Sequence, residues 1–431
     1  MRQNTILQVA LDFTDLERAL KLAREAVEGG CDWLEAGTPL IKSEGLNCIR
    51  RLRKMFPKTV IVADMKVMDV GRTEVEMAAK AGANVVSILG CAGDRTIKEC
   101  VSAGKNYGAK IMVDMIEVGD VVARAKETES MGADFIGMHT SIDRQMAGDI
   151  SFDILSRVAG AVDLPVAVAG GINSENAAEA VKSGAEIIIV GGAVTKSQDA
   201  KKAVKELKRA ITGKIRIKTD LFRRVDEKNV REILYRVSTA NISDALHRQK
   251  NLSGLKTMLA GARIAGQAVT VRTCPGDWAK PVEAIDIAER GNVIVVDAGG
   301  VGPAVWGELA SCSAKEKGLS GVIINGAIRD IPDIKKIKFP AFAVLRSPQA
   351  GEPKGFGEIN VPVVIDGTRI MPGDWVVADD DGVMVIPKRD AAEAANRAMD
   401  VLERENRIRA EIKKGKTTLG KVTELLKWEK K

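Results

Sequence analysis

Val60-Ile61-Val62-Ala63 leads directly into Asp64-Met65-Lys66-Val67-Met68-Asp69 in this chain of 431 residues. Four β-branched or small apolar residues in a row are typical of a parallel strand that is covered on both faces. The charged residues then fall at the carboxyl end of that strand, where parallel α/β sheets hold their chemistry. Side chains two apart in an extended segment share a face, so we expect Asp64 and Lys66 to point together, with Asp69 on the following loop. Taken alone, this spacing is more typical of a surface ion pair.

Eight short apolar runs alternate with amphipathic stretches between residue 5 and about residue 212. Helical periodicity is clear at residues 15–28, 72–81, 121–131 and 174–183, and Gly30 and Gly82 follow two of these stretches, where left-handed C-caps are expected. Eight β–α units in this length predict a (β/α)8 TIM barrel, with an open doubly wound sheet as the alternative. The runs are Ile6–Asp12, Trp33–Gly37, Val60–Lys66, Val85–Gly90, Ile111–Met115, Phe135–Thr140, Val166–Gly171 and Ile187–Gly192.

Polar residues end many of these runs. They are Asp12, Glu35, Asp64 with Lys66, Asp114 and His139. Side chains from so many strands converge only if the sheet closes, and in a barrel they surround one mouth. The glycine pairs Gly170-Gly171 and Gly191-Gly192 follow the seventh and eighth runs, where such barrels commonly bind a phosphate through backbone N–H groups. The strand ends therefore favour the barrel and predict an active site with a phosphate subsite.

The composition, 45% hydrophobic and 29% charged residues, is that of an ordinary soluble protein. No apolar run approaches the ~20 residues that span a bilayer, and no signal-peptide pattern follows Met1, so we expect a cytoplasmic protein without a membrane partner. The net charge of +7 is concentrated in residues 201–250 and 404–431. Aromatic residues do not alternate with these charges as a stacking surface for single strands requires, so a nucleic-acid partner is not expected.

Six separated motifs give residues 3–212 a resemblance to the 3-hexulose-6-phosphate synthases of the orotidine 5'-monophosphate decarboxylase superfamily. The motifs are Leu7–Asp12, Glu35–Thr38, Asp64-x-Lys66-x-x-Asp69, His139-Thr140-x-x-Asp143-x-Gln145, Ala169–Ile172 and Val190–Ala193. The related 3-keto-L-gulonate-6-phosphate decarboxylases share most of these residues, but they usually carry an arginine directly after the last phosphate-loop glycine. This chain has Ala193 there, which favours the synthase and leaves the decarboxylase as the alternative.

The resemblance implies an aldol reaction that joins formaldehyde to the phosphorylated sugar ribulose 5-phosphate, or its reversal, with Mg²⁺ or Mn²⁺ as the cofactor. It implies Glu35 and Asp64 as metal ligands, and oxygen ligands of this kind suit a cation that stabilises an enediolate. In this superfamily the residue at the position of Asp69 reaches into the neighbouring subunit, so a homodimer is also implied. Lys66 would add a fixed positive charge and His139 would move protons. The candidate catalytic residues are Asp12, Lys66, Asp69 and His139.

The alternation of apolar runs with amphipathic stretches stops after residue 212. We therefore expect a barrel domain at residues 1–212, a basic linker at 213–225 and a second domain at 226–400. Strand-like runs with few long crossover helices predict an α/β sandwich in this second domain. The runs are 268–272, 293–297, 322–325, 341–345, 361–365 and 375–378. The charged segment 401–431 has a helical pattern, and we expect a solvated terminal helix or a partly disordered tail.

Residues 235–390 resemble the family that contains the regulator of ribonuclease E activity A and the 4-hydroxy-4-methyl-2-oxoglutarate aldolases. The motifs are Ser243–Leu246, Gly291–Asp297, the glycine-rich loop Gly299–Gly307, Gly326–Asp333, Pro372–Asp374 and Asp380–Val383. The resemblance implies that Arg329 binds a 2-oxoacid carboxylate and that Asp330 helps to hold a divalent metal, with backbone from Gly307, Glu308 and Leu309. The aldolase pattern normally has a further acidic residue just beyond Asp333, where this chain has Ile334-Lys335-Lys336. Three roles stay open: a metal-dependent lyase, a protein-binding regulator of RNA processing, and an assembly module that forms trimers.

Overall fold

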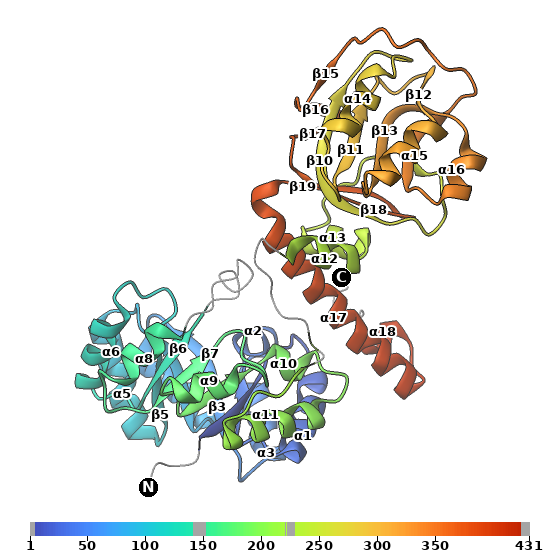
Figure 1. Ribbon diagram of the computed structural model, residues 1–431. Coiled ribbons are helices and arrows are strands. Elements are labelled where there is room, and N and C mark those ends of the chain that lie inside the picture. Colours follow the sequence, from blue (N-terminus) through green and yellow to red (C-terminus); the bar gives the residue numbers. More distant parts are fainter. Residues whose placement is uncertain (1–4, 141–151, 220, 222–228, 424–431) are drawn as a thin grey trace. The chain divides into compact units, whose positions relative to one another are not determined.

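The computed structural model describes residues 5–140, 152–219, 221 and 229–423, so Asp143 and Gln145 lie outside the described residues. The described residues form two compact units (Figure 1). The barrel unit contains the residues up to 221 together with those from Glu403 onward, and the second unit contains residues 229 to 402. Within these ranges, no helix combines the length and the apolar character that crossing a bilayer requires.

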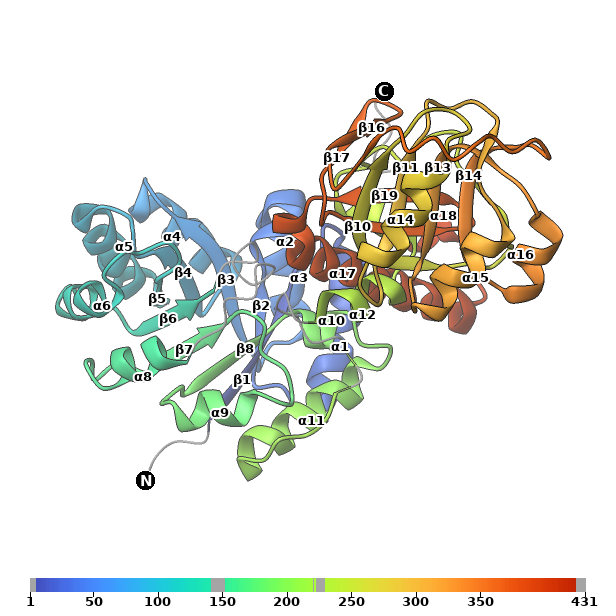
Figure 2. The same ribbon diagram turned by 45° about the horizontal axis from the view of Figure 1, so that its top comes forward.

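Eight parallel strands close into a barrel because β8 pairs with β1, which confirms the predicted TIM barrel. Gly30 and Gly82 end α1 and α4 with φ of 95° and 111°, as the sequence predicts for C-caps. The strands are β1 (Ile6–Leu11), β2 (Trp33–Ala36), β3 (Val60–Val67), β4 (Val85–Leu89), β5 (Lys110–Asp114), β6 (Phe135–His139), β7 (Val166–Ala169) and β8 (Ile187–Val190). The helices around them (Figure 2) are α1 (Leu16–Gly29), α2 (Thr38–Glu44), α3 (Asn47–Met55), α4 (Gly71–Ala81), α5 (Asp94–Tyr107), α6 (Val121–Ser130), α8 (Asp153–Ala159), α9 (Ala177–Lys182), α10 (Gly192–Thr195) and α11 (Ala200–Gly213).

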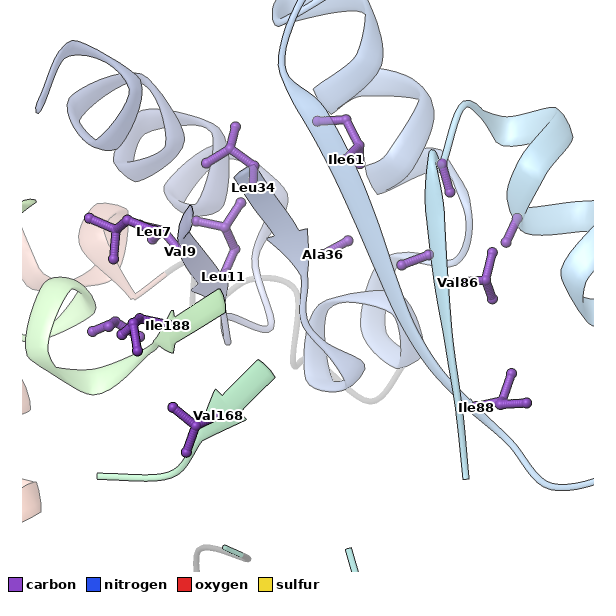
Figure 3. Close-up of a cluster of buried hydrophobic side chains, with 14 of the residues drawn as sticks. Leu7, Val9, Leu11, Leu34, Ala36, Ile61, Val86, Ile88, Val168 and Ile188 are labelled. Carbon is purple, nitrogen blue, oxygen red and sulfur yellow. The ribbon is translucent and has the colours of Figure 1, made fainter. Parts of the chain in front are cut away.

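Alternate residues of each barrel strand belong to two different apolar clusters. On β1, Leu7, Val9 and Leu11 pack outward in the large cluster between strands and helices (Figure 3). Residues of the opposite parity face the lumen, where Val62 and Met112 belong to a second, smaller apolar cluster. The lumen is therefore a packed core at one level, and polar side chains occupy it above that level.

The second unit is built on one mixed sheet with strand order β19-β18-β10-β11-β13-β14-β9, in which β12 also pairs with β13 and β15 with β10. Alternation again separates two cores, because Val293 and Val295 pack on one face of β11 while Ile294 and Val296 pack on the other. Helices α14–α16 lie beside β11 and β13 in Figure 1. This arrangement agrees with the predicted α/β sandwich.

The strands of the second unit are β9 (Lys256–Thr257), β10 (Ile264–Arg272), β11 (Val293–Asp297), β12 (Ala304–Trp306), β13 (Gly321–Ile328), β14 (Ala341–Arg346), β15 (Glu358–Ile359), β18 (Trp375–Asp379) and β19 (Gly382–Ile386), with a separate hairpin of β16 (Val363–Ile365) and β17 (Thr368–Ile370). Its helices are α12 (Val230–Arg236), α13 (Thr239–Ala245), α14 (Ala279–Ile287), α15 (Glu308–Glu316) and α16 (Ile331–Ile337).

The charged end of the chain is helical, as α17 (Ala391–Gly415) and α18 (Leu419–Val422). The expected terminal helix is therefore present, but it is not solvated along its whole length, because Arg407 is only 6% exposed. From Glu403 onward, the described residues of this segment belong to the barrel unit.

Candidate active site

Strand alternation turns a layer of polar side chains into the barrel mouth. Leu34 and Ala36 on β2 pack outward, so Glu35 between them faces the lumen. Glu35 and Asp64, which lies on β3, are both buried, at 7% and 8% exposure. A cavity of about 40 Å³ opens among these groups. The residues that line it are Glu35, Val62, Asp64, Lys66, Ser87, Met112, Asp114, Gly137, Met138, His139, Ala169 and Ile189.

Glu35 is a carboxyl group buried in the barrel lumen. The Gln8 side-chain amide donates a hydrogen bond to Glu35 Oε2. Burial, followed by the negative charges of Asp64 and Asp12, raises the pKa of Glu35 well above its ordinary range. Gln8 Oε1 is a buried oxygen without a hydrogen-bond partner among the described residues. The upper lumen is thus rich in oxygen acceptors and carboxyl groups that repel one another.

Lys66 bridges two carboxylates in this layer. Its Nζ lies 3.2 Å from Asp64 Oδ2 and 3.0 Å from Asp114 Oδ2, while Thr38 Oγ1 donates to Asp64 Oδ2 at 2.7 Å. Burial alone would lower the pKa of Lys66, but the charges of Asp64 and Asp114 outweigh burial and raise it. Lys66 is therefore a permanent positive charge, held in place at the cavity.

The pairing of Asp64 with Lys66 confirms that they point together, but the extended geometry behind that expectation is wrong. The register between β3 and β4 shifts between Ala63 and Val67, and Lys66 adopts a φ of 50°. A non-glycine residue in the left-handed region costs about 1–3 kcal/mol and persists where surrounding contacts determine it. The two carboxylate contacts of Lys66 are such contacts.

Asp114 connects Lys66 to His139. Its Oδ2 lies 3.0 Å from His139 Nδ1, and its Oδ1 accepts a hydrogen bond from Ile116 N at 2.9 Å. Burial would raise the pKa of Asp114, but hydrogen bonding to His139 and the charges of His139 and Lys66 lower it. Asp114 is thus an ionised carboxylate that orients the imidazole through Nδ1.

Asp12 and Asp69 differ from the other predicted catalytic residues because both are exposed. Asp12 lies against two glycines: a Cβ atom on Gly37 would collide with its Oδ1, and one on Gly191 would lie 3.1 Å from its Oδ2. Asp69 Oδ1 accepts a hydrogen bond from Val70 N at 2.7 Å, and Asp69 is not among the residues that line the cavity. The structure therefore places Asp12 at the mouth and Asp69 on the loop after β3.

The two glycine pairs follow β7 and β8, as predicted. Gly170 and Gly171 have φ of 103° and 69°, which side-chain-bearing residues rarely adopt. Gly191 precedes the short helix α10, whose first residue is Gly192. These positions agree with the expected phosphate-binding loops, and the binding itself stays a prediction.

The carboxyl groups of the lumen fit a magnesium ion by their chemistry. Mg²⁺ prefers oxygen ligands and commonly uses one or two carboxylates, with water and substrate completing its shell. Glu35 and Asp64 offer such oxygens, and a cation beside them would offset the burial and the repulsion that together raise the pKa of Glu35. Among the described residues, no three His, Cys, Asp or Glu side chains come together as a metal cage. A two-carboxylate magnesium site does not need a third.

The second unit brings together most of its predicted site. Asp330 Oδ2 accepts a hydrogen bond from Glu308 N at 3.1 Å and lies 3.4 Å from Arg329 Nε. A Cβ atom on Gly307 would lie 2.5 Å from the same oxygen, so only glycine allows this approach. Leu309 is 81% exposed on α15.

The sequence motifs gave no role to Gln8, Thr38 and Asp114, which the structure places in the barrel site. Each contacts a site residue far away in sequence. Gln8 contacts Glu35, 27 residues away, Thr38 contacts Asp64, 26 residues away, and Asp114 contacts His139, 25 residues away. Asp114 had the clearest signal, because it is acidic and ends β5 beside the strand of His139.

Comparison with known proteins finds one family model within each of the two units. Residues 5–207 match the family model described as "Orotidine 5'-phosphate decarboxylase / HUMPS family", and residues 239–385 match the RraA-like model, "Aldolase/RraA". A 3-hexulose-6-phosphate synthase of Bacillus subtilis (strain 168) is 37% identical over 206 residues, which are 48% of this chain and 98% of that protein.

Two solved structures are similar in sequence to segments of this chain. The 3-hexulose-6-phosphate synthase from Salmonella typhimurium is 34% identical and covers 48% of this chain and 99% of its own, with a TM-score of 0.47. The RNA-processing inhibitor RraA from Thermus thermophilis is 30% identical and covers 35% of this chain and 92% of its own, with a TM-score of 0.33.

Proposed function

The chain belongs to the 3-hexulose-6-phosphate synthase family through its barrel, and from this premise we propose that the barrel is a magnesium-dependent aldolase. It interconverts D-arabino-hex-3-ulose 6-phosphate with ribulose 5-phosphate and formaldehyde. The observation that supports this proposal is the linked cluster Asp64–Lys66–Asp114–His139 beside Glu35 in the barrel mouth.

In the synthetic direction, a bond forms between C1 of ribulose 5-phosphate and the carbon of formaldehyde. C1 must first lose a proton, and negative charge then develops on the oxygen of C2, the former ketone oxygen. Glu35 and Asp64 would hold Mg²⁺, which would supply Lewis-acid stabilisation of that charge. Lys66 adds a preorganised positive charge that needs no reorganisation during the reaction.

His139 is the residue that we assign to proton transfer. Its Nδ1 is engaged with Asp114, so Nε2 is the atom that takes the proton from C1. The same nitrogen can return a proton to the oxygen that formaldehyde contributes. In cleavage the roles reverse, and the same groups serve both directions.

The phosphate of the sugar binds, in this proposal, at Gly170-Gly171 and Gly191-Gly192. Asp69 acts in the site of a second copy, since its own side chain lies outside the cavity. Its neighbours Met68 and Val70 are 53% and 58% exposed, and a dimer through this loop would cover their apolar surface.

The experiment that tests the proposal measures formaldehyde released from hexulose 6-phosphate by the full-length chain. We expect release with Mg²⁺ present, loss of activity with excess EDTA, and recovery when Mg²⁺ or Mn²⁺ is returned. Absence of release under every metal condition contradicts the proposal. Carbon dioxide release from 3-keto-L-gulonate 6-phosphate would then identify the decarboxylase alternative.

A second expected result concerns Asp114, which we assign as the positioning residue of His139. Asp114→Asn keeps the shape but removes the charge. Ile116 N keeps the amide oxygen at the Oδ1 position, so the N–H₂ group faces His139 Nδ1 and cannot accept a hydrogen bond from it. We expect kcat to fall by roughly 10²-fold, with the KM for ribulose 5-phosphate changing far less. Steady-state kinetics separates the two constants. A kcat equal to that of the wild type rules out the positioning role.

The second unit takes a carboxylate-binding role in this proposal. The Arg329 guanidinium is about half-exposed, at 43%, next to Asp330, and an arginine fork suits a planar carboxylate. Asp330 is the proposed ligand for a divalent metal there. The regulator role and trimer formation remain alternatives, and proton exchange at the methyl group of pyruvate separates the lyase role from both.

A further inference from the structure

Lys196 lies beside the second glycine pair and has no role in the reaction as described so far. It follows α10 directly, four residues after Gly192. Helical side chains tilt toward the N-terminus of their helix, and Lys196 does so here: a Cβ atom on Gly192 would lie 3.5 Å from its Nζ and 3.4 Å from its Cε. The ammonium group is therefore at the glycine pair itself.

A cation at this loop would strengthen the binding of a sugar phosphate. Its phosphate carries about −1.5 to −2 charges at neutral pH. The carboxylate of Asp12 already faces the loop, since its Oδ2 would lie 3.1 Å from a Cβ atom on Gly191. Lys66 is engaged with Asp64 and Asp114 at 3.2 and 3.0 Å. Backbone N–H groups would thus have to hold a dianion next to a carboxylate unless Lys196 contributes its charge.

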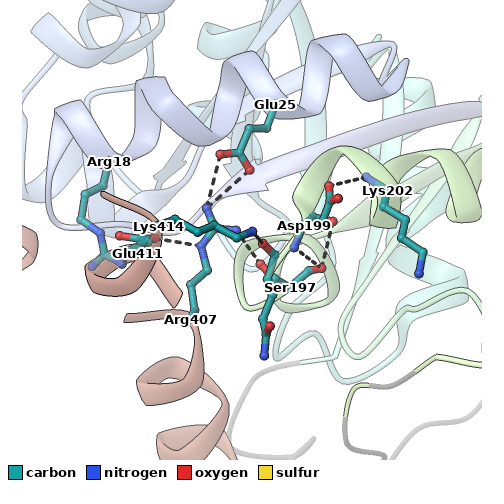
Figure 4. Close-up of polar contacts among 9 residues, drawn as sticks. Arg18, Glu25, Ser197, Asp199, Lys202, Arg407, Glu411 and Lys414 are labelled. Atoms are coloured by element: carbon teal, nitrogen blue, oxygen red, sulfur yellow. Dashed lines mark hydrogen bonds and ion pairs between the residues drawn. The ribbon is translucent and has the colours of Figure 1, made fainter. Parts of the chain in front are cut away.

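An anionic side chain from the end of the chain lies next to Lys196. Glu403 Oε2 is 3.9 Å from Lys196 Nζ, and the two side chains are only 13% and 17% exposed. Both also make other polar contacts. One turn further along α17, Arg407 Nη1 donates to Ser197 O at 2.6 Å, directly after Lys196 in sequence (Figure 4). Arg407 therefore holds the helix that presents Glu403 against this loop.

We propose that Lys196 is a phosphate-binding residue of the barrel, and that Glu403 is the carboxylate which the phosphate displaces from it. This inference rests on the proposed function, because it adds a side chain to the same phosphate subsite. A lysine binds phosphate as a point charge and needs no fixed fork geometry. Its flexible side chain can therefore turn from Glu403 to the phosphate without movement of α10. The end of the chain then sets how tightly the barrel holds its substrate.

The test is calorimetric titration of inorganic phosphate into the full-length chain, which does not depend on catalysis. We expect Lys196→Met to weaken phosphate binding about 10- to 100-fold and Lys196→Arg to retain most of it. Glu403→Gln should strengthen binding a few-fold, because the competing charge is gone. The matched control is Lys202→Met, which removes an exposed lysine of α11 whose Nζ is 3.8 Å from Glu206.

The outcomes separate the two proposals. Equal phosphate affinity in the wild type and in Lys196→Met overturns the assignment of Lys196 while leaving the glycine subsite intact. Unchanged or weaker binding in Glu403→Gln overturns the displacement, even if Lys196→Met fails to fold. A wild-type chain that binds no phosphate counts against the phosphate subsite of the proposed function itself.

Discussion

Asp64→Ala should abolish metal-dependent release of formaldehyde from hexulose 6-phosphate. In our proposal two positive charges stabilise the reacting oxygen, Mg²⁺ and Lys66. Asp64 holds both of them, as a ligand of Mg²⁺ and as an ion-pair partner of Lys66. Removing one preorganised electrostatic group costs about 10²–10³-fold in rate, and this substitution disturbs two. We therefore expect a loss of more than about 10³-fold in kcat, measured by trapping formaldehyde at saturating Mg²⁺.

Two variants make the result interpretable. Asp64→Asn keeps the hydrogen bond from Thr38 Oγ1 possible but removes the charge, so its activity should also be lost. Asp94→Asn removes a carboxylate that is 57% exposed and pairs with Arg124 on the barrel surface, so it should remain as active as the wild type. Substantial activity in Asp64→Ala, with its dependence on Mg²⁺ preserved, would remove Asp64 from the metal site.

The barrel and its polar mouth could be predicted because both follow from short-range patterns. A period of two in Leu7, Val9 and Leu11 fixes which side chains face the helices, and the residues between them must face the lumen. Closure then brings the strand ends together, whatever lies between them in the sequence. The same logic gave the correct position of Glu35, Asp64 and His139 without any knowledge of distances.

Local conformation and long-range pairing could not be predicted in this way. The expected alternation from Asp64 to Lys66 is interrupted by the register shift in β3, where Lys66 has a φ of 50° and contacts two carboxylates. The charged segment after residue 400 resembles a solvated helix because its partners are far away in sequence. Arg407 meets Glu25 across 382 positions, and no pattern within the segment indicates this contact.

Arg407→Met is expected to destabilise the barrel unit by about 2 kcal/mol, because it removes the charged hydrogen-bond donor of two partly buried carboxylates. Arg407 Nε donates to Glu411 at 2.8 Å, Nη2 lies 3.4 Å from Glu25 on α1, and Nη1 donates to Ser197 O (Figure 4). Methionine fills a similar volume but satisfies none of these acceptors. Arg18 remains 3.6 Å from Glu411, so the loss should fall short of that for an isolated buried charge.

Amide hydrogen exchange localises this effect better than a global melting curve, because a chain with two units need not unfold in one step. In Arg407→Met, peptides from α1 and from residues 197–199 should exchange faster, while those from β11 in the second unit should not change. The matched control is Arg409→Met on the same helix, which removes a 52% exposed arginine that pairs with Glu405 at 2.6 Å. An exposed pair of this kind contributes about 0.5 kcal/mol. If both variants behave alike, the terminal helix is not anchored through Arg407, and the position of Glu403 beside Lys196 must depend on other contacts.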